Sequence, residues 1–221
     1  MNFNEFLQHE TLRSEVYRNL AMSYDRPAEG IGDILKMLES GLGFLVSEAM
    51  TPIIMTRSIL HGKSALEDIQ VEHARLFVGP YSLPSPPYGS VYLEGERLVM
   101  GPSTMDALGR YKAAGLTLSN RFKEAPDHIS AELEFMYYLI LKEIDSLRRE
   151  NILETKDWIL QQRDFLRDHP GSWMPSFEQT IKQHAQLDFY KHLAEATRIF
   201  IIEDLEVLEQ SGVPEMAINC K

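Results

Sequence analysis

Apolar residues recur along most of the chain at intervals of three to four positions, the spacing that places them on one face of an α-helix. Alternation of apolar and polar residues, which is typical of a half-buried strand, is nearly absent. We therefore expect one all-α domain spanning residues 1–221, with about eight to ten helices. The runs with helical spacing lie at 12–24, 31–45, 66–77, 129–147, 158–166, 173–181 and 189–205.

Residues that favour helix ends flank several of these runs. Ser, Thr and Asp accept hydrogen bonds from the first free backbone N–H groups of a helix, proline is tolerated in its first turn, and glycine favours its end. On this basis, helices are expected to begin at Thr51–Pro52, at Ser64 with Glu67 in a capping box, at Ser103 and at Pro126–Asp127. The expected ends are Gly62, Gly115, Arg148–Arg149 and His169–Pro170–Gly171.

The helical spacing stops between residues 79 and 102. This window holds nine of the 24 glycines and prolines of the chain, together with Tyr81, Tyr88 and Tyr92. Proline fixes φ and removes a donor, so no continuous helix is expected here. We expect a long loop rich in Pro, Gly and Tyr, with a short extended piece at Ser90–Leu93. Such a loop inside a compact domain is usually functional.

Charge and composition exclude several classes of protein. The chain has 33 acidic and 22 basic residues, a net charge of −11, and a single cysteine, Cys220. A disulfide framework is therefore excluded, and the acidic balance disfavours nucleic-acid binding while allowing a cationic partner. The first residues lack a targeting signal and no apolar run is long enough to span a membrane, so we expect a cytoplasmic protein with no stable membrane insertion.

The usual catalytic and metal-binding patterns are absent. There is no phosphate loop, no nucleophile elbow and no paired-histidine zinc motif. His184, Asp188 and His192 are spaced four apart, but on one straight helix they would spread over roughly 12 Å, too far for a single ion. We expect no catalytic residue and no metal.

The segment around Pro126–Asp127–His128 leaves two interpretations open. His128 and Glu132 are one helical turn apart, so they can pair for acid–base chemistry. Alternatively, Asp127 is a structural acid at the N-cap or in the first turn of a helix. A carboxylate at such a junction can also accept an arginine guanidinium from a partner.

Two ordered motifs resemble the TorD/DmsD family of redox-enzyme maturation chaperones, which is related to the NarJ group. The first runs from Glu72-x-x-Arg75–Leu76–Phe77 through Gly79–Pro80 to Pro86–Pro87–Tyr88–Gly89–Ser90–Val91–Tyr92–Leu93, and the second is Pro126–Asp127–His128–Ile129-x-x-Glu132–Leu133–Glu134. Weaker similarity continues through Trp173-x-Pro175-x-Phe177 to Leu205.

The resemblance implies an all-helical, non-enzymatic protein of the cytoplasm. Such a chaperone binds the twin-arginine signal peptide and apoprotein of a molybdopterin-dependent oxidoreductase subunit, assists cofactor insertion and prevents premature export. We expect Asp127 to contact an arginine, and Tyr88 and Tyr92 to contact apolar signal residues. The implied binding residues are Pro86, Pro87, Tyr88, Ser90, Tyr92, Asp127 and His128, supported by Leu76, Phe77 and Glu134.

Two other functions stay open at this point. Weak guanine-nucleotide binding is described in the family, which allows a nucleotide-binding or GTP-hydrolysing chaperone, although no phosphate loop favours a nucleotide cofactor. The protein can also be an assembly subunit that binds the mature enzyme. The long loops permit either a monomer or a domain-swapped homodimer.

Overall fold

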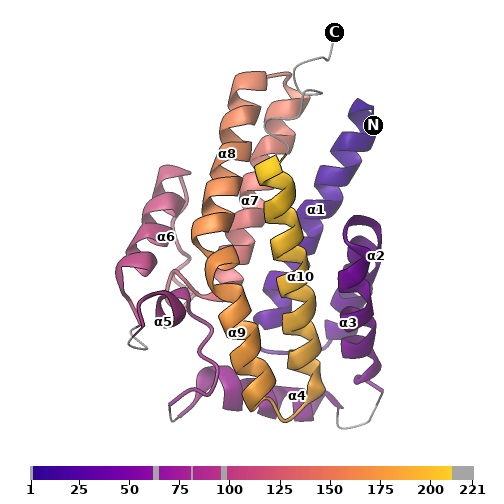
Figure 1. Ribbon diagram of the computed structural model, residues 1–221, viewed down its shortest axis with the longest axis vertical. Helices are drawn as coiled ribbons and strands as arrows, with labels where there is room; N and C mark the ends of the chain where they lie inside the picture. The colour runs from indigo at the N-terminus through magenta and orange to yellow at the C-terminus, as the bar shows by residue number, and fades with distance from the viewer. Residues whose placement is uncertain (1, 62–64, 81, 96–98, 211–221) are drawn as a thin grey trace.

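The computed structural model describes residues 2–61, 65–80, 82–95 and 99–210, which form ten α-helices and one π-helical turn (Figure 1). The all-α prediction is confirmed for these residues, in which the only β-type pairing is an isolated bridge. In chain order the elements are α1 (Phe3–Tyr24), α2 (Ile31–Leu45), α3 (Ser47–Ser58), α4 (Ala65–His73), the π-turn η1 (Ala74–Val78), α5 (Gly89–Leu93), α6 (Pro102–Ala113), α7 (Ile129–Arg148), α8 (Ile152–Asp168), α9 (Pro170–His184) and α10 (Asp188–Gln210).

The long helices form a bundle. Helix α5, which lies within residues 79–102, and helix α6, which begins at the end of them, lie outside it. Helix α1 packs along α7, α7 along α8, and α10 along both α3 and α9. Helices α2 and α3 flank one side of the bundle, whereas the short α5 and α6 lie on the opposite side (Figure 1). Helix α5 contacts α9 and α6, so this helix packs against the bundle through α9.

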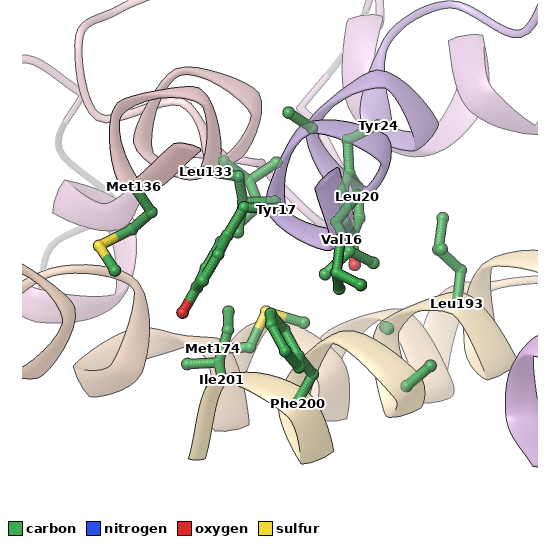
Figure 2. Packing of buried hydrophobic residues seen from close by; sticks show 14 of the residues in the cluster. Val16, Tyr17, Leu20, Tyr24, Leu133, Met136, Met174, Leu193, Phe200 and Ile201 are labelled. Carbon is green, nitrogen blue, oxygen red and sulfur yellow. The ribbon is translucent and has the colours of Figure 1, made fainter. Parts of the chain in front are cut away.

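The core lies where α1 faces α7, α9 and α10. Figure 2 shows Tyr17 and Leu20 of α1 directed toward Leu133 of α7 and Phe200 of α10, and all four side chains are fully buried or nearly so. The Tyr17 and Phe200 rings meet edge to face with centroids 4.9 Å apart. Burial of side chains this large contributes roughly 1.5–3 kcal/mol each, which makes the helical stripes the main source of stability.

A buried ionic network also holds α1 in place. The Arg13 guanidinium donates to Glu143 of α7 (3.2 Å), to Asp204 of α10 (3.1 Å) and to Glu10 one turn away (2.7 Å). It donates to Gln162 of α8 as well. Arg13 is 5% exposed, so a single cation joins four helices inside the fold.

Three of the expected helix starts are wrong, and one of them is Pro126–Asp127, since α7 begins at Ile129 after the N-cap His128. Helix α3 begins at Ser47, and Pro52 lies inside it. The turn before Pro52 is stabilised by packing of the fully buried Ala49, which the local sequence does not reveal. Helix α6 begins at Pro102, and Glu94 replaces a local cap by accepting from the Ser103 backbone N–H at 2.7 Å.

The expected ends fare better. Gly115 follows α6 at φ 81°, and Leu116 N–H donates to Tyr111 O at 2.8 Å, as in a Schellman motif. Helix α7 ends at Arg148, and α8 ends just before His169. Gly62, Ser64, Tyr81 and Cys220, on which other expectations depend, lie outside the described residues.

The loop prediction for residues 79–102 needs one correction. Ser90–Leu93 belongs to the short helix α5 and is not extended. The extended residue is Tyr88, at φ −124° and ψ 129°, which lies immediately before α5. Capping by a distant carboxylate, described below, explains why five residues form a helix that their sequence does not predict.

Candidate functional site

The two sequence motifs meet at one place in the fold. Gly89 N–H donates to the Asp127 backbone oxygen at 2.9 Å, and Ile129 N–H donates to the Pro87 oxygen at 2.9 Å. Tyr88 and His128 lie opposite each other in an isolated antiparallel bridge. The loop before α5 and the start of α7 are therefore fixed together, and we call this region the loop–helix junction.

Asp127 fixes the junction from inside. Its Oδ2 accepts from the Ser90 N–H at 2.8 Å, so the carboxylate caps α5, and its Oδ1 has no hydrogen-bond partner among the described residues. The expectation that Asp127 caps its own helix is wrong, since His128 is the N-cap of α7. Asp127 is 0% exposed, so its side chain is also not available to a peptide arginine in this conformation.

His128 is a buried, neutral cap. Its Nδ1 accepts from the Ser130 N–H at 3.2 Å, which requires that this nitrogen carry no proton. Burial lowers the pKa of His128 to about 4, although Glu124 acts in the opposite direction. The Tyr88 and Phe122 rings meet the imidazole edge to face, with centroids at 5.4 and 6.1 Å.

The expected pairing of His128 with Glu132 does not occur. Glu132 is fully buried and accepts instead from the Trp173 indole N–H (2.9 Å), and it lies 3.2 Å from His169 Nδ1. Both partners are on α9 or at its N-cap, some 40 residues away in the chain, so helical spacing alone could not identify them. The acid–base interpretation of the junction thus loses its proposed pair.

Three exposed carboxylates surround the junction. Glu124 accepts from the Tyr88 hydroxyl at 2.5 Å, and Asp25, at the end of α1, interacts with Ser130 and with Glu134. Burial raises the pKa of Asp25, Glu134 adds to this, and the Ser130 hydrogen bond acts in the opposite direction. We call Asp25, Glu124 and Glu134 the acidic rim. Of these three residues, only Glu134 is predicted from the sequence, because nothing in the local pattern brings Asp25 to this place.

The other predicted residues lie beneath or beside the junction. Pro86, Pro87 and Ser90 are buried, and Tyr88 and Tyr92 are partly exposed. The Tyr92 hydroxyl donates to the Pro86 oxygen at 2.9 Å, while its ring stacks on Trp173 with centroids 5.6 Å apart.

Leu76 and Phe77 are core residues of η1. They are 0% and 5% exposed, and the Phe77 ring contacts Tyr190 at 5.1 Å between centroids. Both were expected as supporting residues of the binding site, and their burial leaves them no exposed surface at the junction.

The described residues contain no group of three or more acidic, His or Cys side chains that could hold a metal. The suspected His184, Asp188 and His192 do not share a helix, since α9 ends at His184 and α10 begins at Asp188. Asp188 instead pairs with Lys191 at 2.8 Å. Among the same residues, no helix is long and apolar enough to cross a membrane.

Comparison with known proteins gives the family to which this all-helical chain belongs. Residues 42–179, more than half of the chain, match the family model described as nitrate reductase delta subunit. The chain therefore belongs to this family, which here includes the TorD and DmsD chaperones.

Two relatives show how far the similarity extends. The chaperone protein TorD of Photobacterium profundum is 28% identical over 199 residues, covering 84% of this chain and 89% of that one. The Tat proofreading chaperone DmsD of Salmonella typhi is 27% identical over 159 residues, covering 72% and 69%. These relatives are chaperones and not enzymes, as the sequence resemblance implies.

A solved structure supports the fold. A protein of Archaeoglobus fulgidus described as a redox enzyme maturation protein superposes with a TM-score of 0.52 at 24% identity, covering 85% of this chain and 93% of that one. The helical architecture is thus shared at low sequence identity.

Proposed function

We propose that this protein is a cytoplasmic chaperone that binds the twin-arginine signal peptide of a molybdopterin-dependent oxidoreductase subunit. By holding the apoprotein, it assists cofactor insertion and prevents premature export. The observation that carries the proposal is the loop–helix junction, where both family motifs are hydrogen-bonded to each other beneath the acidic rim.

The acidic rim is the proposed receptor for the cationic part of the peptide. Carboxylates accept a guanidinium in a bidentate manner, and those of the rim are exposed, unlike Asp127. Burial and the neighbouring charge of Glu134 raise the pKa of Asp25, and an incoming cation would counter the effect of Glu134. The net charge of −11 adds a long-range attraction.

Apolar signal residues are proposed to contact the surface next to the rim. The Tyr88 ring is partly exposed there, and Leu93, at the end of α5, is 39% exposed. Apolar burial contributes roughly 25 cal/mol per Å² before the costs of association are subtracted. Tyr92, which stacks on Trp173, supports this surface more than it extends it.

Asp127 and His128 are proposed to act by positioning the junction. Both are almost fully enclosed, and their hydrogen bonds join α5 to the first turn of α7. Substitution of either is expected to weaken peptide binding through movement of the loop.

Calorimetry with a twin-arginine signal peptide tests the role of the rim. Asp25→Asn, Glu124→Gln and Glu134→Gln should each lower affinity by roughly threefold to tenfold, more at low salt than at high salt. Glu206→Gln, at an exposed position of α10, is the matched control and should change nothing. Unchanged affinity in the triple variant would refute the role of the rim.

A further inference from the structure

A buried histidine connects the surface of α6 to the base of the junction. His169, at the start of α9, lies between two carboxylates, with Nδ1 3.2 Å from Glu132 Oε1 and Nε2 2.8 Å from Asp106 Oδ2. A carboxylate can only accept, so both ring nitrogens must donate when both acids are ionised. With both acids ionised, this geometry therefore places a protonated imidazolium at a position that is 2% exposed.

The pair formed by His169 and Glu132 reaches the loop through Trp173. The second oxygen of Glu132 accepts from Trp173 Nε1 at 2.9 Å, which fixes the orientation of the indole. Helix α5 rests on that indole. Tyr92 stacks on it at an interplanar angle of 8°, and a Cβ placed on Gly89 would come within 2.9 Å of Nε1.

The other groups around His169 allow its charge to be assigned. Helix α6 contributes Asp106 and Arg110, α7 contributes Glu132, and α8 contributes Phe165, whose ring stacks on the imidazole at 4.6 Å. Burial and Arg110 lower the pKa of His169, but the hydrogen bonds and charge of Glu132, together with Asp106, outweigh them and raise it. Arg110 itself is paired with Asp106 and Asp168.

Glu132 depends on this cation. Burial raises the pKa of Glu132, and the bonds from His169 and Trp173 act in the opposite direction. Leaving one member of a buried ion pair without its partner is strongly destabilising. When His169 loses its charge, Glu132 must take up a proton or move, and either change alters the hydrogen bond that holds the indole.

We propose that His169 and Glu132 are positioning residues for the signal-binding loop, which hold Trp173 in the orientation on which α5 rests. The inference deepens the proposed function and rests on it. Peptide affinity then depends on the protonated form of His169. His169 is fully protonated below the ordinary pKa of histidine. The protonated form is lost as pH rises through the raised pKa of His169 in the folded protein.

Calorimetry across the neutral range tests the dependence on His169. The peptide is capped at both ends and contains no histidine, so it does not titrate between about pH 6 and about pH 8.5. Wild-type affinity should fall by roughly tenfold over this range, as expected for loss of a charge-assisted hydrogen bond. His169→Gln should bind weakly at every pH, and His192→Gln, at a half-exposed position away from the pair, should behave as wild type.

A spectroscopic readout separates positioning from general loss of structure. The chain has two tryptophans, so in a Trp158→Phe background the remaining indole N–H resonance belongs to Trp173. This resonance should shift with the same midpoint as the affinity, and Glu132→Gln should abolish the shift. Asp106→Asn removes only the partly exposed partner and should move the midpoint to lower pH while the protein stays folded.

The outcomes are distinct. A wild-type protein that binds no twin-arginine peptide at any pH would overturn the proposed function. Binding that is the same in wild type and His169→Gln, or an indole resonance that does not respond to pH or to Asp106→Asn, overturns only the positioning role.

Discussion

At the scale of single residues, His128 shows how a buried cap links pH to stability. Its pKa is lowered to about 4, mainly by burial, whereas in the unfolded chain it titrates near its ordinary value of 6.5. Between these values the unfolded chain binds a proton that the folded protein does not. The contribution of the neutral His128 to the free energy of unfolding is therefore fully present above the pKa of the unfolded chain. It is lost as pH falls toward the pKa of the folded protein.

A substitution that keeps the cap but removes the titration tests this. Asparagine is a good N-cap acceptor, so His128→Asn should retain the helix start. Between about pH 7 and about pH 4.5, the wild type should lose about 2–3 kcal/mol more unfolding free energy than the variant, as measured by urea denaturation. Equal losses in both proteins would show that His128 is protonated in the fold.

Gly89 is required by close packing. A Cβ there would come within 2.9 Å of Trp173 Nε1, whereas a Cβ on Gly109 of α6 meets nothing within 4 Å. Gly89→Ala should lift α5, cost about 1–3 kcal/mol and lower peptide affinity. Gly109→Ala should instead stabilise the protein by up to about 1 kcal/mol. Thermal unfolding and calorimetry of the two variants measure both effects, and equal behaviour would contradict the packing described.

Residue roles at the site were the least predictable part of the sequence. Asp127 carries every local sign of a helix cap, yet its carboxylate caps α5, and its partner Ser90 is 37 positions away. Glu132 has His128 at pairing distance along the helix but bonds to Trp173 and His169. Tertiary packing determines the hydrogen-bond partners of both residues, and the local sequence pattern contains no information about it.

At the scale of elements, α5 and α6, the helices of the loop region, are stabilised by carboxylates from outside their own sequence. Asp127 caps α5 and Glu94 caps α6, in each case through a backbone N–H of the first turn. The long helices differ, because their apolar stripes are sufficient to predict them. For this reason spacing alone predicts α7 and α10, whereas the sequence of α5 predicts an extended piece.

Helix α1 gives an element-scale prediction. Arg13→Met leaves the buried carboxylates of Glu10 and Asp204 without their cation and should cost about 3–5 kcal/mol. The control Arg18→Met removes an exposed pair with Glu15 and should cost less than about 1 kcal/mol. Chemical denaturation compares them, and a neutral Arg13→Met would mean that the carboxylates are protonated in the fold. Glu143 is not counted among these carboxylates, because burial raises its pKa to about 8, with Glu10 adding to the effect and Arg13 opposing it.

At the scale of the whole molecule, the sequence was sufficient for the fold class and the family. Helical spacing predicts an all-α chain because the apolar stripe of each helix is written in its own sequence, and tertiary contacts only select which stripes pack together. The two motifs are long enough to indicate the family, whose members TorD and DmsD are 28% and 27% identical to this chain. The composition likewise reports net charge. It does not say where charge gathers, and the acidic rim joins the end of α1 to residues about a hundred positions later.

The central claim is that the loop–helix junction and its acidic rim bind a twin-arginine signal peptide. Titration of isotope-labelled protein with this peptide, followed by amide NMR, tests it most directly. The account predicts saturable shifts concentrated at Asp25, at residues 86–93 and at residues 124–134, with a twin-lysine peptide producing weaker binding at the same place. Shifts confined to another surface, such as α2 and α3, or no shifts at all, would contradict it.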